Sequence, residues 1–227
     1  MVKGILYYTD GELDPKLMLK VQEHISKAEL PITSVGLKPI NFGNSIHLDL
    51  PRGPLTMAMQ ILTGLEAMDC DYAYLCEHDV LYSSEHFLGA LPKEDTYLYN
   101  VNVYKINMQD GYGLKVDDCR QLSGLYAHRK TLLTHFKERI KRIKAGGFSR
   151  RIGFEPGTHN RRERIDDLKS EVWSSTVPIL DLRHGANLTS SRWSPDEFRN
   201  KKYTEGWTET KDIKGWGLVS DIIKELT

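Results

Sequence analysis

The 227-residue sequence has no long apolar run, few cysteines and no net charge. Because no stretch reaches about 18 apolar residues, the sequence predicts no transmembrane helix. The opening residues, MVKGILYYTD, become acidic before they could form the apolar core of a signal peptide. The three cysteines (Cys70, Cys76 and Cys119) lack zinc-ligand spacing and favour a reducing, cytoplasmic compartment. With 40% apolar and 27% charged residues, the chain is expected to form a globular domain of ordinary composition.

The absence of net charge conceals an uneven distribution. Residues 1–119 contain 9 Lys/Arg and 17 Asp/Glu, whereas residues 120–164 contain 13 Lys/Arg and 3 Asp/Glu, and residues 165–227 contain 9 and 11. The middle segment therefore has a net charge of +10, which predicts contact with a polyanion. The alternative is a solvated face of a basic helix, which is a common origin of such runs.

The order of hydrophobic patterns favours an α/β fold. Strands are expected at 3–10, 31–39, 45–50, 71–76, 96–108, 112–118, 120–129 and 177–183. Helices are expected to begin at Pro15 and Pro54 and to cover residues 129–144. This alternation indicates a mixed, mostly parallel sheet flanked by helices, and Asp110-Gly111 predicts an inserted hairpin. Residues 186–227 are expected to form an irregular tail that wraps a domain of residues 1–185.

The stretch DYAYLCEHDVLY (71–82) predicts a strand that ends in acidic residues. Glu77 and Asp79 are two residues apart, so in an extended chain their carboxylates leave on one face and repel each other unless a cation lies between them. Carboxylate oxygens suit Mg²⁺ or Mn²⁺, and ligands of open α/β sheets collect at the carboxyl ends of strands. The alternative is an acidic loop that only ends the strand, because a triplet is a short motif.

The order of the elements, the acidic triplet and the segment SGLYAHRKTLL together resemble the GT-A glycosyltransferase fold over about residues 3–185. In that family a D-x-D motif at a strand end holds the metal that binds the donor diphosphate. Here the motif reads Glu77-His78-Asp79, so Asp79 is the better ligand and Glu77 a supporting or water-mediated one. The family's late histidine corresponds to His184 of DLRHG. The resemblance thus implies a UDP-sugar donor with Mn²⁺ or Mg²⁺.

The same resemblance implies further site residues. The donor is expected to contact Tyr8, Thr9, Asp10, Arg52, His78, Ser123 and Gly124. Glu155 of GFEPGTH is the first candidate for the base that takes the acceptor proton, and Asp118 of VDDCRQ is the second. Tyr8 and His184 each have a simpler explanation. A tyrosine at a strand end is commonly buried in the core, and a lone histidine is commonly structural.

The acceptor is predicted from the basic segment. The chain resembles small glycosyltransferases of phage and virus-derived sequences, some of which modify hydroxymethylated cytosines in phage DNA, so the compartment would be the host cytoplasm. Double-stranded DNA would use the positive charges, and its target base would have to be extruded. The expected DNA contacts are Arg150, Arg151, Arg161, Arg162 and Arg164. The alternatives are a glycan or lipid-linked acceptor and a non-catalytic nucleic-acid-binding protein. Neither a membrane anchor nor an obligate protein partner is expected.

Overall fold

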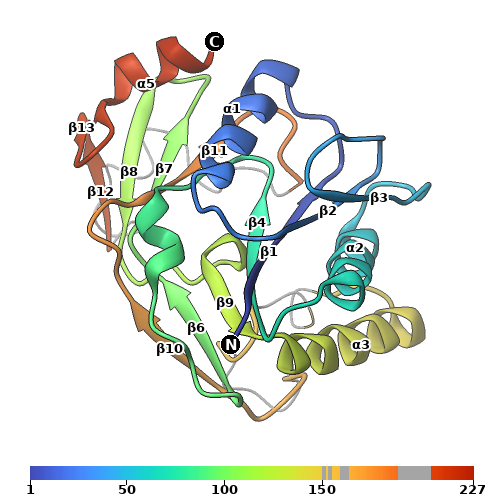
Figure 1. Ribbon diagram of the computed structural model, residues 1–227. Helices are drawn as coiled ribbons and strands as arrows, with labels where there is room; N and C mark the ends of the chain where they lie inside the picture. The colour runs from blue at the N-terminus through green and yellow to red at the C-terminus, as the bar shows by residue number, and fades with distance from the viewer. Residues whose placement is uncertain (150–151, 153–154, 159–163, 189–205) are drawn as a thin grey trace.

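The computed structural model describes residues 1–149, 152, 155–158, 164–188 and 206–227, and within them its main feature is a mixed β-sheet (Figure 1). The strands of this sheet are β1 (Lys3–Thr9), β2 (Ile32–Gly36), β3 (Asn44–His47), β4 (Tyr72–Glu77), β6 (Thr96–Asn100), β9 (Leu125–His128) and β10 (Lys169–Trp173). Their order is β10-β6-β9-β4-β1-β2-β3. Strand β9 is antiparallel to both neighbours, and every other neighbouring pair is parallel. The predicted mixed, mostly parallel sheet is confirmed.

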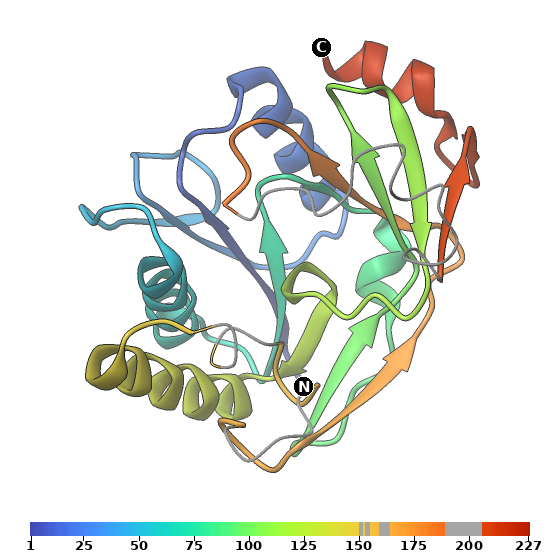
Figure 2. The same ribbon diagram turned by 180° about the vertical axis from the view of Figure 1, so that it is seen from behind.

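Helices cover both faces of this sheet. Helix α1 (Pro15–Ser26) lies on one face, and α2 (Pro54–Ala67) and α3 (Arg129–Gly146) lie on the other (Figures 1 and 2). Successive residues of β1 point to opposite faces, so Ile5 packs in the core with α1 while Leu6 packs in the core with α2 and α3. The predicted helix starts are confirmed, and Asp14 accepts hydrogen bonds from the first backbone amides of α1. None of the helices in the described part of the chain is both long and apolar enough to cross a bilayer.

The described part of the chain also forms a second, five-stranded sheet. It contains β5 (Val80–Leu81), β7 (Val103–Asn107), β8 (Tyr112–Val116), β11 (Ile179–Arg183) and β12 (Trp207–Thr210), in the order β12-β8-β7-β11-β5. Strands β7 and β8 form the hairpin predicted at Asp110-Gly111, and Gly111 has φ of 71°. Strand β11 pairs with β7 on one side and with β5 on the other. Because β5 follows β4 directly, this pairing brings the end of β11 beside the acidic end of β4.

The strand expected over residues 96–108 is instead two strands in different sheets, β6 and β7. The chain changes sheet at residues 101–102, where the side-chain oxygen of Asn100 accepts hydrogen bonds from the backbone amides of Asn102 and Ser175. The Asn100 amide also donates to the Ser175 hydroxyl. The alternating pattern holds within each strand, but alternation alone does not reveal which sheet a strand joins.

The end of the chain is more regular than expected. The described part of the tail contains β12, β13 (Asp212–Ile213), β14 (Gly217–Leu218) and α5 (Val219–Leu226), so the prediction of an irregular tail is wrong there. Helix α5 lies beside α1 and β8 (Figure 1), and its Ile222 and Leu226 join the α1 core. An ion pair of 2.8 Å links Glu225 to Lys20. The predicted domain boundary after residue 185 stays a prediction. Two short 3₁₀ turns, Ser84–Leu88 and Leu122–Gly124, complete the described elements.

Candidate active site

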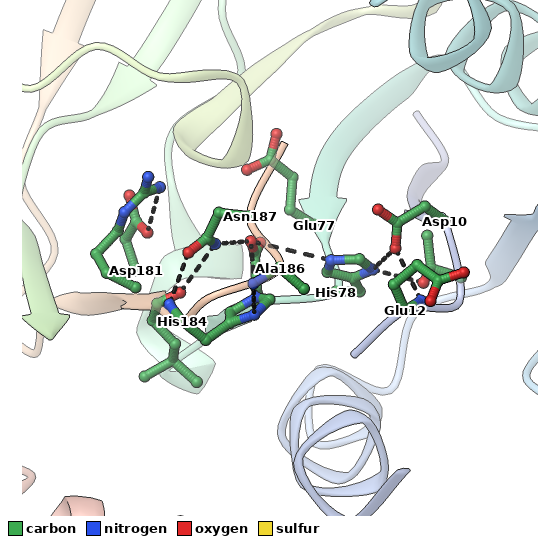
Figure 3. A network of polar contacts seen from close by, with 12 residues as sticks. Asp10, Glu12, Glu77, His78, Asp181, His184, Ala186 and Asn187 are labelled. Carbon is green, nitrogen blue, oxygen red and sulfur yellow. Dashed lines mark hydrogen bonds and ion pairs between the residues drawn. The ribbon is translucent and has the colours of Figure 1, made fainter. Parts of the chain in front are cut away.

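The candidate site lies where β1, β4 and β11 end. Tyr8 is paired with Glu77 in the parallel register of β1 and β4, so both strands end at the same edge. His78 and Asp79 form a turn between β4 and β5, and the backbone carbonyl of Asp79 accepts a 2.8 Å hydrogen bond from the Leu182 amide. This bond brings the residues after β11, including His184, next to Asp79 (Figure 3).

Three side chains at this edge are arranged as ligands of a metal ion. One donor atom from each of His78, Asp79 and His184 lies within 4.8 Å of the other two. The Oδ2 atom of Asp79 lies 3.6 Å from Nε2 of His184 and 3.9 Å from Nε2 of His78. Adjacent ligands of a bound ion lie about 3 Å apart when bonds are about 2.1 Å, so small side-chain movements would close this set around a cation.

The hydrogen bonds of the two imidazoles test whether a cation fits. Nδ1 of His78 lies 2.5 Å from the Thr9 hydroxyl and 3.5 Å from Asp10 Oδ1, which favours the ring proton on Nδ1 and leaves the Nε2 lone pair toward Asp79. Nε2 of His184 is buried without a hydrogen-bond partner among the described residues. Its Nδ1 accepts a long, 3.3 Å hydrogen bond from the Ala186 amide, so binding of a cation to Nε2 requires the ring proton to move to Nδ1 and this weak bond to break. With that one change of tautomer, the donor set fits a cation.

The chemistry of the donors narrows the choice of ion. Imidazole nitrogens suit transition ions, whereas Mg²⁺ prefers oxygen ligands and keeps several waters. Two imidazoles with one carboxylate therefore favour a transition-metal ion over Mg²⁺. Burial alone would raise the pKa of Asp79, but His184, His78 and the amide of Asn187 outweigh it and hold that pKa below its ordinary value. Asp79 is thus ionised and ready to bind a cation.

Glu77, which the sequence predicted as a metal ligand, lies outside this three-residue group. The turn at residues 78–79 ends the extended backbone that would have placed Glu77 and Asp79 on one face. The Glu77 carboxylate points away from both rings (Figure 3) and accepts a 2.8 Å hydrogen bond from the Tyr8 hydroxyl. Burial, followed by the charge of Asp79, raises the pKa of Glu77. His78 is therefore a member of this group of possible ligands and Glu77 is not, and the role of Glu77 as a ligand stays a prediction.

The expected donor contacts at the ends of β1 and of the loop before α2 lie beside this group. Nε of Arg52 lies 2.5 Å from Oδ2 of Asp10, and Arg52 also donates to the backbone carbonyl of Ala186. A cationic side chain is thus fixed next to the candidate metal ligands. Tyr8 is 5% exposed and packs in the core, and its hydroxyl contacts Glu77.

Ser123 and Gly124, which were expected to let the sugar approach the backbone, are both buried. The Ser123 hydroxyl accepts a 2.6 Å hydrogen bond from the Gln121 amide. A Cβ atom at Gly124 would lie 2.7 Å from the backbone oxygen of Asn100. The small residue is therefore required by the close packing of this turn against the end of β6.

Glu155, the first candidate for the general base, lies at the same edge of the sheet. The Tyr99 hydroxyl, near the end of β6, donates a 2.7 Å hydrogen bond to the carbonyl of Pro156. Burial raises the pKa of Glu155 to about 7, against the opposing charges of Arg139 and Lys105. Its charge in turn contributes to the raised pKa of Glu77, so the two carboxyl groups share one electrostatic environment.

Asp118, the second candidate base, is placed differently. It has a left-handed backbone conformation with φ of 46°, and its exposed carboxylate lies 3.1 Å from Nε of Arg120. No described contact connects it with the group at Asp79.

The turn at Gly157 holds Glu155, and this gives a testable expectation. Gly157 has φ of 70°, and a Cβ atom there would lie 2.8 Å from the Tyr97 ring and 3.1 Å from the backbone of Lys169. Gly157→Ala is expected to lower the free energy of unfolding by about 1–3 kcal/mol and to reduce turnover, because the turn must move. Urea denaturation and initial rates measure the two effects. Gly111→Ala is the matched control, since φ is 71° and no atom lies within 4 Å. Equal turnover of the two variants would contradict this role.

The described part of the basic segment is largely engaged within the chain. Lys137 pairs with Glu66 at 3.2 Å, and Arg142 pairs with Glu138 at 2.7 Å. Arg129 donates to two backbone carbonyls at and beyond the end of α2. Among the expected DNA contacts, Arg164 pairs with Asp167. The others lie outside the described residues: Arg150, Arg151, Arg161 and Arg162.

Sequence reasoning missed two polar contacts near the site. The amide of Asn187 donates to Oδ2 of Asp79 at 2.7 Å, and Lys105 pairs with Asp181 at 2.8 Å across the β7–β11 register. Asn187 follows His184 by three residues, but that spacing has no general meaning for a metal site. The Lys105–Asp181 contact depends on strand pairing between distant segments, which the sequence does not indicate.

No family model and no curated protein matches the sequence. A nucleotidyl transferase from Methanothermobacter thermautotroptrophicus is similar with 11% identity and a TM-score of 0.41, covering 60% of this chain and 76% of that chain. A glycosyltransferase involved in glycosylation of the major capsid of PBCV-1 has 8% identity and a TM-score of 0.46, with coverage of 83% and 95%. The glycosyltransferase GlyE of Streptococcus pneumoniae TIGR4 has 11% identity and a TM-score of 0.43, with coverage of 75% and 45%.

All three sequence identities are 11% or lower, and all three TM-scores are below 0.5. The fold is supported by the strand pairing described above, and the site by its own contacts.

Proposed function

We propose that this chain is a divalent-cation-dependent glycosyltransferase that uses a nucleotide sugar, a UDP-sugar, with Mn²⁺ preferred over Mg²⁺. The observation that carries the proposal is the convergence of His78, Asp79 and His184 at the carboxyl edge of the parallel strands, with Arg52 fixed beside them. Ligands of open α/β sheets bind at this edge. A carboxyl group with a pKa of about 7, Glu155, lies at the same edge.

Each of the site residues has a separate role in the proposed reaction. The cation, when bound by His78, Asp79 and His184, would neutralise negative charge that grows on the departing diphosphate. Thr9 and Asp10 hold the His78 ring, and Arg52 offers a positive charge to the phosphates. Glu155 is the proposed acceptor of the proton that leaves the attacking hydroxyl group.

The acceptor proposed first is 5-hydroxymethylcytosine in double-stranded DNA. The net charge of +10 over residues 120–164 supports it, because phosphate contacts supply much of the affinity for DNA. The ion pairs of Lys137, Arg142 and Arg164 favour a second candidate, a glycan acceptor, because cations that are engaged within the chain are less available to phosphates.

Nucleoside mass spectrometry combined with an assay of UDP release separates these candidates. The protein is incubated with Mn²⁺, a pool of UDP-sugars and duplex DNA that contains hydroxymethylcytosine, with unmodified DNA as the control. A gain of one sugar mass on the modified base alone is the expected result. Metal-dependent UDP release without that gain would retain the glycosyltransferase and discard the DNA acceptor. The absence of both would contradict the proposal and favour a nucleic-acid-binding protein.

A further inference from the structure

One side chain, Asn187, connects the two candidate ligands that come from different strands. Its amide nitrogen donates to Oδ2 of Asp79 at 2.7 Å and to the backbone carbonyl of Leu182 at 3.2 Å. Its amide oxygen accepts a 2.6 Å hydrogen bond from the backbone amide of His184. The orientation of the Asp79 carboxylate and the position of the His184 backbone are therefore fixed by the same group (Figure 3).

The oxygen that Asn187 holds is the one that faces both imidazoles. Oδ2 of Asp79 is the carboxylate atom with contacts of 3.6 and 3.9 Å to the ring nitrogens of His184 and His78. An ionised carboxylate oxygen can accept two hydrogen bonds or ligand contacts, so the amide leaves one position for a cation. The 2.7 Å bond from Asn187 restrains rotation of this carboxylate.

The segment that carries Asn187 is held from a second side. Arg52 donates to the carbonyl of Ala186 and is itself paired with Asp10 at the end of β1. The backbone between His184 and Asn187 is thus tied to β1 through Arg52 and to the turn after β4 through Asp79. A ligand-bearing segment with two such ties is preorganised for binding.

We propose that Asn187 is a positioning residue that sets both the affinity and the preference of the cation site. By holding Asp79 as a ligand through a single oxygen, it favours a small ion such as Mn²⁺ over Ca²⁺. Calcium takes six to eight oxygen ligands and often binds both oxygens of a carboxylate. This inference rests on the proposed cation-dependent function, which it deepens by assigning the ion preference to one residue.

The test compares cation affinities of the unaltered protein and its Asn187→Ala variant, without any sugar donor. Free Mn²⁺ is measured by electron paramagnetic resonance, and Ca²⁺ by competition against Mn²⁺. Partners of metal ligands typically contribute about 10- to 100-fold in affinity. Asn187→Ala is therefore expected to weaken Mn²⁺ binding by at least about tenfold, while Ca²⁺ binding weakens by less than about threefold. The preference for Mn²⁺ over Ca²⁺ is therefore expected to decrease in the variant, whereas a general loss of structure would weaken the binding of both ions alike.

Asn102→Ala is the matched control. Asn102 directly precedes β7, and its side chain donates a 2.8 Å hydrogen bond to the Ser175 carbonyl. Because β7 runs parallel to β11, Asn102 lies at the end of this strand pair opposite to His184. The control is expected to retain both affinities. If Asn187→Ala does not fold, as judged by thermal unfolding, Asn187→Ser is measured against the same criterion, because serine is too short to span Asp79 and Leu182.

The possible results separate the inference from the proposed function. Unchanged Mn²⁺ affinity in the variant, or an equal loss for both ions, would overturn the role of Asn187 while leaving the cation site in place. Failure of the unaltered protein to bind Mn²⁺ would overturn the cation site itself, and the inference with it.

Discussion

Asp79→Asn is expected to lower the rate of metal-dependent UDP release by about 10²–10³-fold. A cation at a departing diphosphate contributes several kcal/mol to the stability of the transition state, and each 1.36 kcal/mol corresponds to a tenfold change in rate. The substitution keeps the size of the side chain but removes the charge that the surrounding imidazoles and the Asn187 amide stabilise. Initial rates at saturating UDP-sugar over a range of Mn²⁺ concentrations measure the loss.

Glu77→Gln is the control that gives this result its meaning. Glu77 is two residues away and similarly placed at the end of β4, but it lies outside the three-residue group and accepts a hydrogen bond from Tyr8. Burial raises the pKa of Glu77, and glutamine resembles its protonated form. The control is expected to retain activity within about tenfold. A loss as large as that of Asp79→Asn would indicate that the cation binds the acidic pair, as the sequence motif alone predicted.

Glu155→Gln is expected to reduce turnover by about 10²–10⁴-fold, the usual contribution of a general base. The pH dependence supplies a second signature. Burial raises the pKa of Glu155 to about 7, so the group is protonated and inactive as a base below that pH and ionised above it. The rate of the unaltered protein should therefore rise with pH through a midpoint near 7. The glutamine variant should show no such rise, because its side chain cannot titrate.

Asp118→Asn is the comparison for this prediction, because Asp118 is the other candidate base and is exposed and paired with Arg120. It is expected to retain nearly full activity. Loss of activity in Asp118→Asn, with retention in Glu155→Gln, would transfer the role of base to Asp118. A rate that does not change between pH 6 and 8 in the unaltered protein would contradict a titrating base with a pKa of about 7.

The parts of the site that could be predicted from the sequence are those that depend on strand ends. Apolar strands that stop at Thr9 and at Glu77 place their following residues at one edge of a parallel sheet, whatever the rest of the fold does. His184 was expected only through the resemblance to a known family. The structure brings it to Asp79 because β11 pairs with β5.

The exchange of Glu77 for His78 in the ligand group could not be predicted. Side chains two residues apart share a face only where the backbone is extended, and the chain leaves the extended conformation at His78. Whether a strand ends one residue earlier or later decides which side chains face each other. The sequence contains no glycine or proline at this point to mark the change.

The basic segment of residues 120–164 shows a different limit of prediction from sequence. Counting Lys and Arg over residues 120–164 predicted a surface for a polyanion. The count could not show that Lys137 meets Glu66 on α2, or that Arg129 donates to carbonyls near the end of α2. These partners are distant in sequence and become neighbours only when α2 and α3 pack together. Charge density is therefore weaker evidence for a partner than charge that remains available after folding.

The location of bound Mn²⁺ tests the central claim most directly. Crystals of the protein grown with Mn²⁺ and UDP would be measured with X-rays near the manganese absorption edge, where anomalous scattering identifies the ion. We expect a manganese peak bonded to Nε2 of His78, Oδ2 of Asp79 and Nε2 of His184, with the remaining positions filled by diphosphate oxygens and water. A peak bonded to Glu77 and away from both histidines, or UDP bound at this edge without manganese, would contradict the account.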